Sequence, residues 1–277
     1  MAAQLQIAYL GPEGTFSHLV AKKRFGARAK LFPQPSIFDV FDFVRSGAKS
    51  LGIVPIENSS GGTIYETVDC LVDETNQLAI LEDLSLNVRL ALMGRRGEKI
   101  ATVYSHFVPM RHCEPWLREK LPHAKRVPVA STAKAAELAA RERNSAALGT
   151  RDAAKRNDLD ILKFPVHSTV PNITQFYCVG RAARPIPRSS RTTIVVTLPN
   201  RPGSLYDFLG CFKNAGVNLT RLLSRPIIGR HKAYLFLVDI AGTPDQPKIK
   251  STLAAARTTC ESLRILGIYP VHSMYAS

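Results

Sequence analysis

Cysteine is scarce in this sequence, and the spacing that metal sites need is missing. The five cysteines, Cys70, Cys113, Cys178, Cys211 and Cys260, are odd in number and lie far apart, and no two form a Cys-x-x-Cys pair. Disulfide frameworks and zinc sites both depend on closely patterned cysteines. The sequence therefore argues against both, predicts no metal site, and indicates a reducing compartment.

Long apolar runs are missing as well. No stretch is long enough to cross a bilayer, and the N-terminus leads directly into a strand-like segment without the basic and apolar regions of a signal peptide. We therefore expect a cytoplasmic protein without a membrane partner.

Acidic residues are few relative to basic ones. Thirty-seven Lys and Arg against 22 Asp and Glu give a formal net charge of +15. This balance attracts anions, which could be nucleic acid or a small polycarboxylate. The basic residues are scattered rather than gathered in one run, and no aromatic side chains interleave with them as a base-stacking groove requires. We therefore expect no nucleic-acid partner.

Short apolar segments alternate with helical patterns through the first 180 residues. The expected strands are 5–10, 51–56, 99–104, 125–130, 145–149, 161–166 and 175–180, with a long strand-like stretch at 78–93. The expected helices are one capped by Ser17 and ending at Phe25, one capped by Ser131 and Thr132 and ending at Arg141, and segments 38–44, 64–72, 110–121 and 151–156. This alternation predicts an α/β fold with a parallel or mixed sheet.

A proline-rich and charged stretch at 184–190 predicts a linker. Beyond it, strands at 192–198, 217–223, 233–240 and 263–269 alternate with helices at 204–215 and 247–259. The order β-α-β-β-α-β is the ferredoxin-like pattern.

Three polar clusters follow predicted strands, and a fourth, at 172–176, precedes the last strand of the first part of the chain. Gly11–Ser17, Glu57–Ser60, Ser105-His106 and Asn172–Phe176 supply hydroxyl, amide and backbone donors. Open α/β sheets bind ligands at the carboxyl ends of their strands. Each cluster also has a structural interpretation, because Ser17, Ser131 and Thr132 suit helix caps and the glycines at 11 and 14 suit a turn.

Taken together, these clusters resemble the prephenate dehydratase family. The resemblance rests on Tyr-Leu-Gly-Pro-Glu-Gly-Thr-Phe-Ser at 9–17, Val-Pro-Ile-Glu-Asn-Ser at 54–59, Val-Tyr-Ser-His at 103–106, Ser-Thr-Ala at 131–133 and Asn-x-Thr-x-Phe at 172–176. Residues 191–274 resemble an ACT domain. The resemblance implies a catalytic domain at 1–184 with two lobes, like a periplasmic binding protein, and an ACT regulatory domain at 191–277. Lobe 1 would hold about 1–81 and 168–184, and lobe 2 about 82–167.

The resemblance also implies a reaction and roles for residues. Prephenate would lose carbon dioxide and its ring hydroxyl to give phenylpyruvate, and no cofactor is needed because aromatisation drives the step. Thr174 would donate a hydrogen bond to the departing oxygen, and Asn58, Ser59 and Ser105 would position the substrate. Glu57 would be either a buried carboxyl with a raised pKa or a structural acceptor. The substrate-binding residues would be Gly14, Thr15, Phe16, Gln175 and Phe176, with the ring of Phe176 in the core.

The sequence departs from the family pattern at several of these positions. Gln175 stands where the family has the arginine of Thr-Arg-Phe, and His112 stands where it has a glutamine, beside a new Arg111. One hypothesis is that positive charge lost at 175 is restored from 111 and 112, with His112 in a catalytic role. The alternative is that Arg111 is a solvated helix residue.

The ACT segment departs too. The family's Gly-Ala-Leu-Val is Gly-Ser-Leu-Tyr at 203–206, and its Glu-Ser-Arg-Pro is Leu-Ser-Arg-Pro at 223–226. The resemblance implies a phenylalanine effector site at a dimer interface, with feedback weakened or altered by these changes. Its residues would be Gly203, Ser204, Leu205, Asn218, Leu219, Ser224 and Arg225.

Two other functions stay open at this point. One is a divergent paralogue that decarboxylates prephenate or prefers arogenate, and the other is a non-catalytic ligand-binding sensor. The resemblance further implies a homodimer or homotetramer, because ACT domains pair across a two-fold axis.

Overall fold

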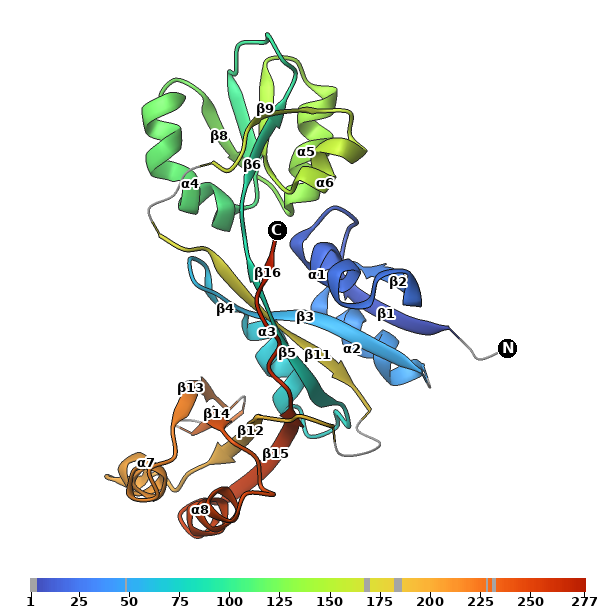
Figure 1. The fold of residues 1–277 in the computed structure, drawn as a ribbon. Helices are drawn as coiled ribbons and strands as arrows, with labels where there is room; N and C mark the ends of the chain where they lie inside the picture. Colours follow the sequence, from blue (N-terminus) through green and yellow to red (C-terminus); the bar gives the residue numbers. More distant parts are fainter. Residues whose placement is uncertain (1–3, 48, 167–169, 182–185, 228, 231–232) are drawn as a thin grey trace. The chain divides into compact units, whose positions relative to one another are not determined.

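A computed structural model describes the chain except for residues 1–3, 48, 167–169, 182–185, 228 and 231–232 (Figure 1). The chain forms two compact units. Unit 1 comprises Met1–Thr67, Leu84–Tyr177 and Ser273–Ser277, and unit 2 comprises Val68–Asp83 and Cys178–His272. Within the described residues, no helix combines the length and the apolar character that crossing a membrane requires.

The helices and strands are labelled in Figure 1. In chain order they are β1 (Leu5–Leu10), α1 (Phe16–Phe25), a 3₁₀ turn η1 (Gly26–Arg28), β2 (Ala29–Gln34), α2 (Ile37–Ser46), β3 (Ser50–Asn58), β4 (Gly62–Thr63), α3 (Tyr65–Val72), β5 (Ala79–Asn87), β6 (Ala91–Gly94), β7 (Thr102–Ser105), α4 (Phe107–Lys120), β8 (Lys125–Pro128), α5 (Thr132–Arg141), β9 (Ser145–Gly149), α6 (Arg151–Arg156), β10 (Asp160–Lys163), β11 (Ile173–Gly180), β12 (Arg191–Thr197), α7 (Ser204–Asn214), β13 (Leu219–Pro226), β14 (Tyr234–Ala241), α8 (Pro247–Arg257), β15 (Ser262–Tyr269) and β16 (Tyr275–Ala276).

A seven-stranded sheet organises the first part of unit 1, which we call lobe 1. Its strand order is β16-β5-β11-β3-β1-β2, with β4 paired to β3, and β1 runs parallel to both β2 and β3. Strand β2 was not expected from the sequence, because Lys30, Pro33 and Gln34 interrupt its apolar pattern. It lies at the end of the sheet order, and an edge strand tolerates a proline.

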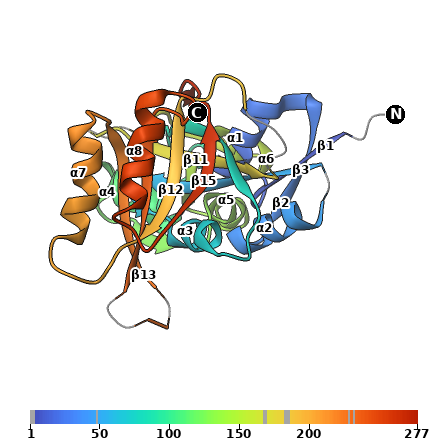
Figure 2. The same cartoon turned by 90° about the horizontal axis from the view of Figure 1, so that it is seen from below.

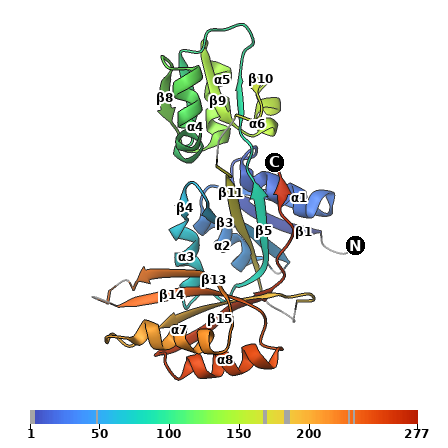
Figure 3. The ribbon, with the colours of Figure 1, turned by 60° about the vertical axis from the view of Figure 1, so that its left-hand side comes forward.

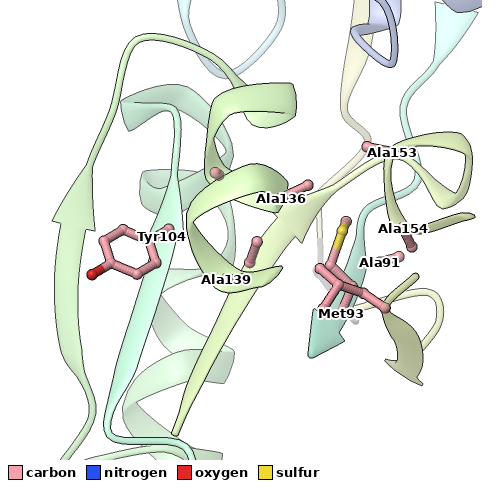
Figure 4. Packing of buried hydrophobic residues seen from close by; sticks show 10 residues of the cluster. Ala91, Met93, Tyr104, Ala136, Ala139, Ala153 and Ala154 are labelled. Carbon is pink, nitrogen blue, oxygen red and sulfur yellow. The ribbon is translucent and has the colours of Figure 1, made fainter. Parts of the chain in front are cut away.

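A five-stranded sheet in the order β10-β6-β9-β7-β8 organises the second part of unit 1, which we call lobe 2. Its core is built largely from alanines that are fully buried on α5, α6 and β9. In Figure 4, Met93 lies beside Ala91 and Ala154, and α5 presents Ala136 and Ala139 to the same core. Small side chains allow a helix to pack close to its sheet, and larger side chains such as Met93 and Tyr104 fill the remaining space.

The stretch 78–93, expected as one long strand, is two strands in two different sheets. It breaks at 88–90, where the chain passes from β5 in lobe 1 to β6 in lobe 2. The returning chain pairs with this break, since the Val88 amide donates to the Asn172 carbonyl at 2.7 Å and the Val166 amide donates to the Leu90 carbonyl at 2.8 Å. The two connections between the lobes are therefore hydrogen-bonded to each other.

Among the described residues of unit 1, the helices α1, α2, α4, α5 and α6 each begin at a side-chain cap. The cap of α1 is Thr15, whose hydroxyl accepts from the His18 amide, and not Ser17 as the sequence suggested. Ser17 lies inside the first turn because the helix begins at Phe16. The cap of α5 is Ser131, as expected. Helix α4 begins three residues earlier than expected, because the side chain of His106 serves as its cap.

Unit 2 contains the predicted ferredoxin-like fold. Its sheet has the order β13-β14-β12-β15, with every neighbouring pair antiparallel. Helices α7 and α8 lie side by side on one face of this sheet (Figures 2 and 3). They enclose a core that includes Ile194, Val196, Phe208, Phe212 and Val238. The expected α/β fold class, with a ferredoxin-like C-terminal part, is confirmed.

The compact units do not follow the domain boundaries expected from the sequence. Residues 68–83 belong to the same unit as the C-terminal sheet, and Ser273–Ser277 belong to unit 1, where β16 pairs with β5. Of the expected linker at 184–190, positions 184 and 185 lie outside the described residues, and 186–190 contain no helix or strand.

Two buried carboxylates of unit 2 form ion pairs with arginines. Asp83, which is 1% exposed, accepts from the Arg191 guanidinium at 2.8 Å. Asp239 accepts from Arg221 at 2.8 Å and from the Thr193 hydroxyl at 2.7 Å. Burial raises the pKa of the Asp83 carboxyl and outweighs the opposing attraction of Arg191 and Arg221.

Candidate active site

A cavity of about 670 Å³ lies in unit 1. The end of β1 and the start of α1, the start of α2, and the β3–β4 hairpin line it from lobe 1, and the starts of α4 and α5 line it from lobe 2. Asn172, directly before β11, and Thr174 and Phe176 within it complete the wall. The volume is in the range of small-molecule sites, and the walls come from strand ends and helix starts, as in other α/β folds.

The caps of four helices line this cavity, namely Thr15 of α1, Ser36 of α2, His106 of α4 and Ser131 of α5. A helix N-terminus carries about half a positive charge and unpaired amides. The first turns of α1, α4 and α5 contain no acidic residue, whereas that of α2 contains Asp39. Three helix ends at the wall therefore have no acidic residue in their own first turn, and the acidic residue among the described lining residues is Glu66 of α3.

The described lining residues include no arginine and no lysine. One hypothesis from the sequence was that Arg111 and His112 restore the positive charge that is lost at Gln175. None of Arg111, His112 and Gln175 is among the lining residues. The attraction for an anion in this cavity therefore comes from helix ends rather than from cationic side chains.

Thr174 is 8% exposed and its hydroxyl is held by Asn58. The Asn58 Nδ2 donates to Thr174 Oγ1 at 2.8 Å and to Asn172 Oδ1 at 2.7 Å, and its Oδ1 accepts from the amides of Ser60 at 2.9 Å and Gly61 at 2.7 Å. The two backbone donors fix which end of the Asn58 amide is oxygen. Thr174 Oγ1 must therefore accept from Asn58, which leaves its own hydrogen to donate elsewhere.

Ser59 forms hydrogen bonds with backbone groups and does not line the cavity. Its hydroxyl donates to the Pro171 carbonyl at 3.0 Å and accepts from the Ile173 amide at 2.9 Å, while its own amide donates to the Ile173 carbonyl. Glu57 lies opposite Thr63 in the β3–β4 hairpin and is half-buried. Neither Ser59 nor Glu57 is among the lining residues.

Two further residues expected at the site lie away from the wall. Ser105 is fully buried and its hydroxyl donates to the Leu148 carbonyl at 3.1 Å. His112 Nδ1 lies 2.8 Å from Ser60 Oγ, and burial lowers the pKa of its imidazole. Arg111 donates to the Ser60 carbonyl.

The loop before α1 is positioned by contacts on both sides. Gly14 has a φ of +90°, which favours glycine, and its amide donates to His18 Nδ1 at 3.2 Å. Its carbonyl accepts from the Thr150 hydroxyl of lobe 2 at 2.7 Å. These contacts present Thr15 and Phe16 to the cavity, and both line it, whereas Gly14 itself does not.

Sequence reasoning missed several lining residues, among them Ser36, Phe38, Ile64 and Val108. A signal existed for Ser36, because a serine directly before an apolar run of helical period is a helix cap. No local signal distinguishes Ile64 or Val108 from ordinary core residues.

The residues expected to bind an effector fall into two groups within unit 2. Gly203, Ser204 and Leu205 form the start of α7, and Asn218 and Leu219 form the start of β13, whereas Ser224 and Arg225 lie near the other end of β13. At a rise of roughly 3.4 Å per residue, the six steps from Leu219 to Arg225 span about 20 Å. Within a single copy of unit 2, the two groups of candidate effector residues therefore lie apart.

Arg225 is engaged in a bidentate ion pair. Its Nε and Nη2 lie 2.8 and 2.7 Å from the two carboxylate oxygens of Asp69 in α3. Ser204 is buried, and its hydroxyl has no hydrogen-bond partner in the described part of the chain.

The fold and cavity define a two-lobed α/β ligand-binding domain joined to a ferredoxin-like domain. Comparison with known proteins identifies the family to which the chain belongs. Residues 7–184 match the family model of prephenate dehydratase, and residues 192–258 match that of the ACT domain. The chain belongs to the prephenate dehydratase family and carries an ACT domain.

Three proteins serve as examples of those that are similar to this chain. The chain is 34% identical over 269 residues to the bifunctional chorismate mutase/prephenate dehydratase of Pseudomonas aeruginosa, covering 96% of this chain and 73% of that protein. The structure of prephenate dehydratase from Arthrobacter aurescens in complex with L-Phe matches with a TM-score of 0.87 at 29% identity, covering 96% of this chain and 90% of that one. The structure of GqqA, described as a novel type of quorum quenching acylase, matches with a TM-score of 0.85 at 29% identity, covering 96% and 98%.

Proposed function

We propose that the chain is a carbon–oxygen lyase that converts prephenate to phenylpyruvate, with Thr174 as the hydrogen-bond donor to the leaving oxygen. The observation that supports this most strongly is the polarity of the Asn58–Thr174 hydrogen bond. Because Asn58 donates to Thr174 at 2.8 Å, the threonine hydrogen is free to point at a ligand. A hydroxyl with this orientation suits an oxygen that gains negative charge as it departs.

The proposed chemistry needs no redox partner. The ring carboxylate of prephenate leaves as carbon dioxide, its bonding electron pair enters the ring, and the C–O bond to the ring hydroxyl breaks. The dianion thus yields the phenylpyruvate monoanion, carbon dioxide and hydroxide. Thr174 stabilises the hydroxide through a hydrogen bond and does not transfer its own proton, because a threonine hydroxyl is too weak an acid.

The two carboxylates of prephenate require positive potential at the cavity wall. The starts of α1, α4 and α5 supply it through partial charges and free amides. Burial lowers the pKa of His106, so that this cap is neutral at neutral pH and its Nδ1 accepts from the Val108 amide. Gln175, outside the lining, does not contact the substrate in this proposal.

The direct test is to incubate the pure protein with prephenate and to follow the absorbance of phenylpyruvate in alkali. Phenylpyruvate formation supports the proposal. A non-aromatic dihydro product instead means a decarboxylase, and unchanged prephenate means a binding protein.

The domain and assembly proposals extend this function. We assign residues 1–184 to catalysis and 191–277 to regulation by an amino acid such as phenylalanine. The roughly 20 Å between the two groups of candidate effector residues supports a site completed by a second copy, and therefore a homodimer or homotetramer. Cysteines present as thiols rather than disulfides support a cytoplasmic location.

A second candidate function is acylase activity. Two observations favour it, namely the likeness to GqqA and the 2.8 Å approach of Ser60 Oγ to His112 Nδ1. A serine hydrogen-bonded to a neutral histidine is the beginning of a nucleophile–base pair. Among the described residues, the hydrogen-bond partner of His112 is Ser60 and no carboxylate pairs with its ring, so the third member of a triad is missing there. Release of free amine from an N-acyl amide, abolished by Ser60→Ala, would establish this function.

A further inference from the structure

The turn between β3 and β4 is where lobe 2 touches the residues around Thr174. Ser60 lies at the centre of the turn and makes contacts through its amide, its carbonyl and its hydroxyl. Its amide donates to Asn58 Oδ1 at 2.9 Å, its carbonyl accepts from Arg111, and its hydroxyl lies 2.8 Å from His112 Nδ1. Arg111 and His112 lie on α4, which packs against the lobe 2 strands β8 and β9.

The next residue shows how closely this turn approaches α4. A Cβ added to Gly61 would lie 3.0 and 3.2 Å from the two methyl groups of Val108. A side chain at position 61 would therefore press against the start of α4. The turn is fixed by packing as well as by hydrogen bonds, so a shift of α4 would be transmitted to it.

From the turn, the contacts continue to the reacting group. Asn58 Oδ1 accepts from both the Ser60 and the Gly61 amides, and the other end of the same planar amide donates to Thr174. Because the amide is rigid, the position of the two backbone donors sets the direction in which Nδ2 points. A displacement of Ser60 therefore turns the group that orients the Thr174 hydroxyl.

We propose that Ser60 is a positioning residue, which transmits the contact with Arg111 and His112 on α4 through Asn58 to Thr174. The inference rests on the proposed dehydratase function. It also gives Arg111 and His112 a role other than the one suggested by the sequence, because neither has to reach the cavity. The Thr174 hydroxyl is then oriented for reaction only when α4 of lobe 2 is in contact with the turn.

The experiment compares the steady-state kinetics of variants with prephenate. Ser60→Ala removes only the hydroxyl and keeps the backbone contacts with Asn58 and Arg111. Loss of one neutral hydrogen bond predicts a fall in kcat of roughly 3- to 10-fold. The Michaelis constant and the affinity for phenylpyruvate by calorimetry should change by less than about twofold, because binding groups are untouched.

Variants at position 112 separate positioning from a general structural role. His112→Ala should match Ser60→Ala, and the double variant should fall no further than either single one, because both lose the same hydrogen bond. His112→Gln should restore kcat, since its amide can still bond to Ser60. Arg156→Gln is the matched control. It removes a different contact between the lobes, the ion pair with Glu13, together with the ion pair to Asp152 within α6, and should leave kcat unchanged.

Distinct outcomes overturn the inference. A kcat of Ser60→Ala equal to that of the parent contradicts it. A fall in the kcat of Arg156→Gln as large as that of Ser60→Ala also contradicts it, because the loss of any contact between the lobes would then lower kcat. Additive effects of Ser60→Ala and His112→Ala also contradict it. Failure of the proposed function looks different, because the parent protein would then form no phenylpyruvate, and the inference would fall with it.

Discussion

Replacing Asn58 by aspartate keeps the shape of the side chain but removes the two hydrogen bonds that its Nδ2 donates, to Thr174 and to Asn172. The carboxylate can still accept from the amides of Ser60 and Gly61, so the turn should stay folded. Its second oxygen, however, can only accept. The Thr174 hydroxyl, which now accepts from Asn58 at 2.8 Å, would have to donate its hydrogen to position 58 and could no longer offer it to the leaving oxygen.

The size of the expected fall in kcat follows from the hydrogen bond between Thr174 and the leaving oxygen, which is lost in the transition state. A hydrogen bond to a charged group contributes about 1.5–3 kcal/mol. Because about 1.4 kcal/mol corresponds to a factor of ten in rate, kcat should fall roughly 10- to 150-fold. Protonation of the new carboxyl would restore a donor, so the activity of Asn58→Asp relative to the parent should rise as the pH is lowered.

The assay is phenylpyruvate formation by the variant and the parent over a range of pH, with circular dichroism to verify the fold. Asn157→Asp is a matched control, because it removes a similar amide donor, to the Ala153 carbonyl, on α6. Full activity of Asn58→Asp at neutral pH, or a loss that is the same at every pH, would refute the hydrogen-bond polarity on which the mechanism depends.

Three further predictions test the anion site, the core of unit 2 and the regulation. Ser131→Asp keeps a good helix cap but places a negative charge at the cavity, so KM for prephenate should rise about fivefold at low salt, whereas the neutral cap Ser131→Asn should leave it unchanged. Because the pKa of Asp83 is raised in the folded protein, the folded state retains a proton that the unfolded state releases, and stability should fall as the pH rises from about 4 through that raised pKa. Urea unfolding should show this slope in the parent and not in Asp83→Asn. L-phenylalanine should bind weakly by calorimetry, because Leu223 replaces a charged family residue and Tyr206 a smaller one; tight binding would contradict this prediction.

The sequence predicted the local features of this fold well. Helix α5 with its Ser131 cap, helix α7 ending before Gly216, and the β-α-β-β-α-β order of unit 2 all depend on short-range patterns that are visible in the chain. The resemblance also singled out Thr174 and Asn58, which the structure brings within 2.8 Å although 116 residues separate them.

The roles of single polar residues were less predictable, because their partners are set by tertiary structure. Ser59 bonds to Ile173 and Ser105 to Leu148, and neither partner has a side-chain feature that the sequence could reveal, since the bonded atoms are backbone amides and carbonyls. His112 was expected at the reacting group, yet its recorded hydrogen bond is to Ser60, 52 residues earlier. Edge strand β2 was missed because Pro33 is unfavourable in a central strand but tolerated at an edge.

The most direct test of the proposed mechanism is the turnover of prephenate by two variants at position 174. Thr174→Val keeps the shape of the side chain without its hydroxyl, and Thr174→Ser keeps the hydroxyl. We predict that Thr174→Ser forms phenylpyruvate at a rate near that of the parent and that Thr174→Val loses at least about tenfold in kcat. Equal rates for Thr174→Val and the parent would contradict the claim that this hydroxyl assists the departure of the ring oxygen.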